Sequence, residues 1–223
     1  MSAELTFRDV GYPVFFDHFS CEIQAGSSAL IVTSGEAESN IFTRLFSALS
    51  TPSAGSISIN SQDLATLDSE QIYDLRHRIG IVPAHGGLIS NLKVWENITL
   101  PTVYHRGAVS PEEEAAASAY LEQLGYRGNL MALPAHLSLQ EKRSVALVRT
   151  WLTQPDIVVY NHCYEDLPAQ ELATFSRLAS EFHTTCSDRI SLYLTSSADL
   201  AAKLKVDRIL HLHKPAQAIT RDI

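Results

Sequence analysis

Short apolar runs of strand length alternate with segments of helical periodicity over most of the chain. Runs suited to strands buried on both faces of a sheet occur at 27–33, 78–84, 155–161, 189–195 and 207–213. Segments with helical spacing of apolar residues lie between them, at 41–49, 68–77, 168–182 and 198–204. Strands that alternate with helices predict an α/β fold, with a mostly parallel sheet flanked by helices.

The N-terminal part departs from this alternation. Short strands are predicted at 4–10, 19–24 and 56–64, with Ala25-Gly26 as a turn after the second. We expect these strands to form an antiparallel β portion of the fold, beside the parallel sheet.

The middle of the chain is predicted to be helical, because 90–152 contains almost no β-rich run. Ser110 and Pro111 start one helix, which should end at Gly125. Ser138 with Glu141 has the spacing of a capping box and starts another. We therefore predict one domain over 1–223: a core of 1–89 and 153–223, and a helical subdomain inserted at about 90–152.

Composition excludes several classes of protein. The net charge of −8, from 17 basic and 25 acidic side chains, argues against a nucleic-acid binder. No apolar run of about 18 residues predicts a membrane span, and the first residues lack the pattern of a signal peptide. Three cysteines without C-x-x-C spacing predict reduced thiols rather than a zinc site. His211 and His213 would share one side of a strand without a third ligand, so no metal site is predicted.

The turn between the strand at 27–33 and the next helix is placed as a phosphate-binding loop would be. In G-x-x-x-x-G-K-[ST], glycine backbone cradles phosphate, lysine neutralises it and a hydroxyl holds Mg²⁺. Aligned without gaps, this chain has other residues at the two glycines, the lysine and the hydroxyl: Thr33, Glu38, Ser39 and Asn40 respectively. Glu36 adds a second carboxylate. Two like charges about 4 Å apart repel by roughly 4 kcal/mol at an effective dielectric of ~20, so this turn opposes a triphosphate.

Taken in order, the segments resemble the ATP-binding subunit of ABC transporters over nearly the whole chain. Residues 47–64 resemble AGLxxPdsGxIxxxGxDL, and 75–101 resemble LRrrIGxVFQxxgLfxxLTVxENVxxP. Residues 137–162 resemble LSGGxxxRVAlARAlxxxPdlLLlDE, and 207–213 resemble the closing strand DRixvLh. The second half of the stretch 75–101 is most similar to the Mla-type lipid-transport and FtsE-like members of the family. The resemblance implies a P-loop NTPase-like fold of the ABC type.

The chain departs from that family at the positions of its chemistry. Ala84 stands where the family has the glutamine that senses metal and nucleotide. After Ser138, Leu139 and Gln140 replace both glycines of the signature LSGGQ. The Walker B aspartate, the catalytic glutamate, the D-loop aspartate and the switch histidine are replaced by Asn161, His162, Pro168 and Ser196.

Simple structural interpretations exist for the same residues. Thr33 and Glu36 have the spacing of a capping box, so Glu36 is expected to satisfy helix amides that a phosphate would otherwise bind. The alternative is a retained anion or nucleotide site. His162 could act as a general base, but without lysine or metal it has little to act upon. Ser138, Ser196 and the histidines are not spaced as a nucleophile triad.

The sequence therefore predicts a non-catalytic, ABC-type subunit with no catalytic residues, no metal and no cofactor. The resemblance implies an integral membrane permease as partner, a homodimer or a heterodimer with another ABC ATPase, and a cytoplasmic position on the inner face of the membrane. The permease contact is expected along 84–98, with His85, Leu88 and Trp95 as candidates. One alternative is a functional ATPase with divergent motifs, which would need ATP and Mg²⁺. The other is a soluble interaction module that meets no permease.

Overall fold

The computed structural model describes residues 4–212 of the 223. A five-stranded sheet runs through its centre, and all the strand pairs in it are parallel. Its strands, in spatial order, are β6 (Ile79–Val82), β7 (Ile157–Asn161), β8 (Ile190–Thr195), β3 (Ser28–Val32) and β9 (Arg208–His211). The predicted mostly parallel sheet is confirmed, although the expected end of the last strand, at His213, lies outside the described residues.

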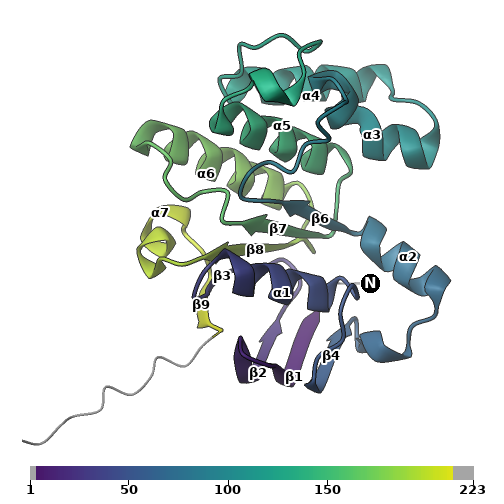
Figure 1. The fold of residues 1–223 in the computed structure, drawn as a ribbon, viewed down its shortest axis with the longest axis vertical. Helices are drawn as coiled ribbons and strands as arrows, with labels where there is room; N and C mark the ends of the chain where they lie inside the picture. The colour runs from purple at the N-terminus through teal and green to yellow at the C-terminus, as the bar shows by residue number, and fades with distance from the viewer. Residues whose placement is uncertain (1–3, 213–223) are drawn as a thin grey trace, which may run out of the picture.

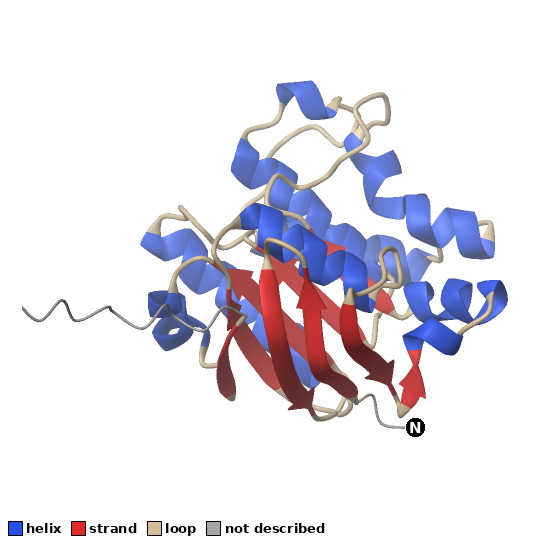
Figure 2. Ribbon diagram, turned by 60° about the horizontal axis from the view of Figure 1, so that its bottom comes forward, coloured by secondary structure: helices blue, strands red, loops and turns tan. Residues whose placement is uncertain are grey.

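A second, antiparallel sheet forms the lower part of the molecule in Figure 1. Its order is β2 (Phe16–Ile23), β1 (Leu5–Tyr12), β4 (Ala54–Ile59) and β5 (Gln62–Asp63). Helix α1 (Glu36–Phe46) lies between this sheet and the parallel one (Figures 1 and 2). The Phe42 ring of α1 stacks on Phe7 of β1, with ring centroids 4.9 Å apart. The predicted antiparallel N-terminal portion is therefore confirmed.

Three helices gather at the opposite end, at the top of Figure 1. They are α3 (Val94–Arg106), α4 (Pro111–Gln123) and α5 (Leu139–Leu152). The predicted serine cap at Ser110 and the predicted capping box at Ser138 are present: the Oγ atoms of Ser110 and Ser138 accept the backbone N–H groups of Glu113 and Glu141. The remaining helices are α2 (Ser69–His77), α6 (Ala169–Thr184) and α7 (Ala201–Leu204).

The parallel sheet separates two apolar cores, because successive side chains of a strand point to opposite faces. In β7, Val158 and Tyr160 join a core with α3 to α6, whereas Ile157 and Val159 join a core with α1 and the antiparallel sheet. Helix α5 is the central helix of the first core, where Trp151 is fully buried. With both faces covered, only the edges and ends of this sheet are left to build a site.

A candidate site at the carboxyl ends of the parallel strands

The turn after β3, the turn after β7 and the end of β8 meet at the carboxyl edge of the parallel sheet. This edge is where open α/β sheets bind ligands. Pairing fixes the meeting: Val32 of β3 lies opposite Thr195 of β8, and Asn161 of β7 lies opposite Leu194. The residues that follow these three strands are therefore brought together from distant parts of the sequence.

The turn after β3 is closed by one of its own carboxylates. The backbone N–H of Ser34 donates to Glu38 Oε2 at 2.5 Å, and Glu38 is almost fully buried. The expected capping box of Thr33 with Glu36 is wrong, because the N-cap of α1 is Gly35, two residues later, and it has no side-chain bond. Glu36 instead points outward to His85, with 3.5 Å between its Oε2 and His85 Nε2.

A chain of hydrogen bonds joins serine, histidine and glutamate across this edge. Ser39 Oγ lies 2.7 Å from His162 Nε2, and His162 Nδ1 lies 2.9 Å from Glu165 Oε1. Thr33 Oγ1 adds a bond of 2.8 Å to Ser39 Oγ. The sequence analysis considered only Ser138 and Ser196 as triad serines, so it did not foresee this chain through Ser39. The order resembles a nucleophile triad, but Ser39 is completely buried, so no substrate can reach its hydroxyl.

Glu165 is the centre of this network and was missed in the sequence. Its Oε1 also accepts the Thr195 hydroxyl at 2.8 Å, the Ser196 N–H at 2.7 Å and the Ser196 hydroxyl at 3.0 Å. Partial burial acts to raise the pKa of Glu165, but the hydrogen bonds from His162, Ser196 and Thr195 outweigh it and lower that pKa to about 2. The carboxylate is therefore charged, and it fixes the end of β8 to the turn after β7.

Two asparagines form a separate pair beside this chain. Asn161 Nδ2 donates to Asn40 Oδ1 at 2.8 Å. Within the described residues, Asn161 Oδ1 is buried and has no hydrogen-bond partner. Neutral amides bind Mg²⁺ poorly compared with the carboxylate that an octahedral site needs, and here one amide is already bound to the other.

The other predicted site positions are structural in this arrangement. The Ala84 carbonyl accepts Arg143 Nε at 2.7 Å, and the same guanidinium donates to the Glu165 carbonyl at 2.8 Å. Ser138 caps α5, and Pro168 is the N-cap residue of α6. Within residues 4–212, no hydrogen bond joins Ser138 or Pro168 to the network around Glu165.

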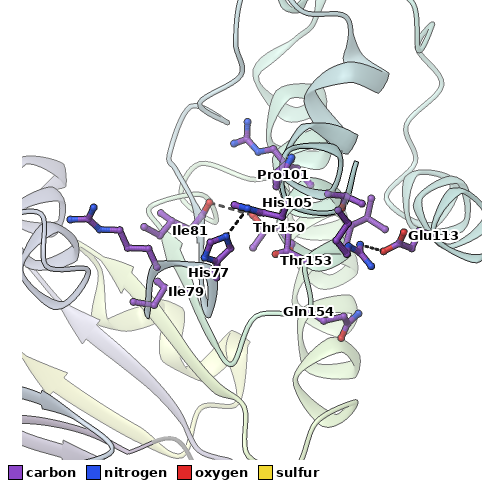
Figure 3. Close-up of a pocket in the computed structure, with 15 residues that line it drawn as sticks. His77, Ile79, Ile81, Pro101, His105, Glu113, Thr150, Thr153 and Gln154 are labelled. Atoms are coloured by element: carbon purple, nitrogen blue, oxygen red, sulfur yellow. Dashed lines mark hydrogen bonds and ion pairs between the residues drawn. The ribbon is translucent and has the colours of Figure 1, made fainter. Parts of the chain in front are cut away.

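The three candidate permease contacts differ in exposure. His85 is exposed, whereas Leu88 and Trp95 are partly buried against the core that contains α5. A pocket of about 430 Å³ lies nearby, between β6, the end of α2, and helices α3 and α5 (Figure 3). Its lining does not include His85, Leu88 or Trp95; it includes Arg76, His77, Ile81, Pro101, Thr102, His105, Arg106, Glu113, Arg149 and Thr150.

The fold, with its turns at the carboxyl edge of the parallel sheet, defines the class of protein: a P-loop NTPase-like α/β protein with an antiparallel β portion and an inserted helical region. The family follows from direct comparison. The ABC transporter family model matches residues 17–161, and the chain belongs to this family. Among residues 4–212, no helix has the length and apolar character that crossing a membrane would require.

Two relatives match different shares of this chain and of their own length. The methionine import ATP-binding protein MetN 2 of Pseudomonas aeruginosa is 31% identical over 162 residues, which is 72% of this chain and 48% of that protein. The chain thus spans about half the length of that relative. The lipoprotein-releasing system ATP-binding protein LolD of Pseudomonas fluorescens is 29% identical and matches 95% of this chain and 96% of its own.

Solved structures agree on the fold. The ATP-binding cassette MJ0796, solved as a dimer bound to ADP and Pi, has a TM-score of 0.77 at 21% identity, covering 94% of each chain. A bacterial Atm1-family ABC exporter with ATP bound has a TM-score of 0.75 at 28% identity; the match covers 95% of this chain and 37% of the exporter.

Proposed function

We propose that this chain is a non-catalytic, ABC-type subunit of a membrane transporter complex. The observation that carries the proposal is the chain from Ser39 through His162 to Glu165, which fills the carboxyl edge of the sheet with the protein's own side chains. A nucleotide would have to break these bonds and displace the Glu38 carboxylate from the Ser34 amide.

Electrostatics support the same proposal. Residues 33–40 contain two carboxylates and no lysine or arginine. Phosphoryl transfer depends on positioning and on neutralising charge, which a lysine and a bound metal usually provide. Here the negative charges of Glu36 and Glu38 oppose a triphosphate, and the Asn40–Asn161 pair offers no anionic ligand to Mg²⁺.

The complex we propose places this subunit on the cytoplasmic face of a membrane, held there by an integral membrane permease. The pocket between the α/β core and α3 and α5 is the surface offered for that contact, and it carries Arg76, Arg106 and Arg149 against a single carboxylate, Glu113. An acidic, partly apolar segment of a permease would complement it. The subunit would act as a homodimer or beside an active ABC ATPase, and no cofactor is required.

The alternative function is an ATPase with divergent motifs. The relatives MetN 2 and LolD favour it, because both are named as ATP-binding proteins. An equilibrium titration with Mg-ATP separates the two functions. We expect no saturable binding up to millimolar nucleotide, and no phosphate release from either the natural protein or Ser39→Lys, because several other positions also differ. Micromolar binding that is abolished by Asn161→Ala would overturn the proposal.

The remaining alternative, an interaction module without a permease, is tested separately. The full-length protein expressed in cells that contain its natural membrane proteins should co-purify with an integral membrane protein in mild detergent. Substitution of Arg106 by glutamate should weaken that association, because it reverses a charge in the pocket. Recovery of the protein entirely without a membrane partner would favour the interaction module.

A further inference from the structure

Two histidines from different helices meet at the rim of the pocket in Figure 3. His77 is the last residue of α2, and His105 lies in the last turn of α3. The His77 Nε2 and His105 Nδ1 atoms are 2.6 Å apart, and the ring centroids are 3.7 Å apart. Neither residue takes part in the network around Glu165, so the pair needs an explanation of its own.

The tautomer of His77 is fixed by its other nitrogen. His77 Nδ1 lies 2.8 Å from the carbonyl oxygen of Tyr73, and a carbonyl only accepts, so Nδ1 carries the proton. The Nε2 lone pair of His77 is then directed at His105 Nδ1. A backbone carbonyl that holds one ring nitrogen so that the other presents its lone pair is the usual support for a metal-binding imidazole.

Tyr73 supplies a third ligand atom beside the two imidazoles. The Tyr73 hydroxyl lies 3.3 Å from His105 Nδ1.

The neighbouring arginines are directed elsewhere. Arg76 donates to the carbonyls of Ser47 and Ala48, and Arg106 pairs with Glu113. Their charges reduce the affinity of a cation here, but their donors do not compete with the metal for the imidazoles.

We propose that His77 Nε2 and His105 Nδ1 bind a divalent transition-metal ion of the Zn²⁺ or Ni²⁺ class, with the Tyr73 hydroxyl and water completing its coordination. These metals favour imidazole ligands. Bonds of about 2.0–2.1 Å in a tetrahedral site require roughly 3.3 Å between the two nitrogens. The exposed His105 ring therefore moves outward by a fraction of an ångström on binding, and the proton that its Nδ1 donates to His77 Nε2 in the metal-free protein passes to its own Nε2. Within residues 4–212, no group of three or more His, Cys, Asp or Glu side chains could hold a metal, so this site depends on two imidazoles.

The site would join two parts of the molecule. Helix α2 leads into β6 of the parallel sheet, whereas α3 belongs to the helical region at the top of Figure 1. A metal at this position would hold the two sides of the pocket together and control what docks there. That regulatory consequence rests on the proposed permease contact, but the metal binding itself does not.

The test is a titration of the chelator-treated protein with Ni²⁺, Zn²⁺ and Co²⁺ at neutral pH. Binding is measured by calorimetry and, for Co²⁺, also by visible absorption. We expect one ion per chain with a micromolar Kd, and a loss of affinity of at least about tenfold in both His77→Ala and His105→Ala. His136 and His211 are exposed histidines outside the pocket. His136→Ala and His211→Ala are therefore controls, and both should bind one ion with the affinity of the natural protein.

A second variant covers the risk that loss of a ring disturbs the fold. His105→Phe keeps an aromatic ring beside His77 and removes the donor nitrogen, so it should fold and still lose the metal. Binding that is unchanged in His77→Ala and His105→Phe, or the absence of any one-to-one binding, would overturn the proposal. Neither result bears on nucleotide binding, which the Mg-ATP titration measures separately.

Discussion

At the scale of single residues, Glu165 determines the geometry of the candidate site. Its Oε1 accepts a hydrogen bond from the Nδ1–H group of His162, so His162 Nε2 is directed at Ser39 Oγ. His162 has a backbone φ of 54°, in the left-handed region that costs a residue with a side chain about 1 kcal/mol or more. The hydrogen bonds on both ring nitrogens offset that cost.

Removing the charge of Glu165 should destabilise the protein in a pH-dependent way. Because the pKa in the folded state is about 2, below the ordinary 4.5, the carboxylate contributes stability above pH 4.5 that is lost as the pH falls toward 2. Glu165→Gln should lower the free energy of unfolding by about 2 kcal/mol at pH 7, after allowance for partial exposure, and by less at pH 3.

Urea unfolding at the two pH values measures this difference. Glu181→Gln is a suitable control, because Glu181 forms an exposed pair with Arg177 and should change stability little at either pH. An equal loss at pH 7 and pH 3 in Glu165→Gln would contradict the lowered pKa.

At the scale of elements, α5 is the part on which the first core depends. Trp151 is fully buried, stacks on Phe182 of α6 with ring centroids 5.5 Å apart, and donates from its indole N–H to the Tyr160 hydroxyl of β7 at 3.1 Å. One side chain of α5 thus contacts both its neighbouring helix and the sheet.

Truncation of this side chain should be among the more damaging core substitutions. Trp151→Ala is expected to cost about 3–5 kcal/mol in the free energy of unfolding, because it leaves a cavity and an unpaired Tyr160 hydroxyl. Tyr104→Ala, at a side chain exposed by 72%, should stay within about 0.5 kcal/mol of the natural protein in the same denaturant titration. Similar losses in the two variants would show that α5 is not central to the core.

Local elements could be predicted from the sequence, whereas their contacts could not. The capping box of Ser138 with Glu141 joins two residues that are three positions apart, so it is visible in the pattern. The bond from Ser39 to His162 spans 123 residues and depends on the order of strands in the sheet. The Thr33–Glu36 prediction failed although it was local, because the helix begins only at Glu36 with Gly35 as its N-cap, and the Thr33 hydroxyl bonds Ser39 instead.

At the scale of the whole molecule, Arg143 links the helical region to the sheet. It comes from α5, is almost fully buried, and donates to the carbonyls of Ala84 and Glu165, which follow β6 and β7. This guanidinium therefore fixes two loops at the carboxyl edge relative to α5.

Loss of that link should loosen both loops together. Arg143→Ala should destabilise the protein by about 2–3 kcal/mol, because two buried carbonyls lose charged donors. Hydrogen exchange should accelerate in 84–89 and 163–167, and remain unchanged in the antiparallel sheet. Arg149→Ala, which removes the donors to the carbonyls of Gly86 and Gly87, should accelerate exchange in the first loop alone. Unchanged exchange at 163–167 in Arg143→Ala would contradict the link.

The order of strands has a consequence for biosynthesis. Strand β3 is made early, but both of its neighbours in the sheet, β8 and β9, come from the last part of the described chain. Its apolar residues Ala29, Leu30 and Ile31 thus have no strand to pair with until the ribosome has passed Thr195. Such non-local pairing slows folding and leaves an aggregation-prone segment uncovered in the nascent chain. We expect the growing polypeptide to depend on chaperones that bind exposed apolar segments during this interval.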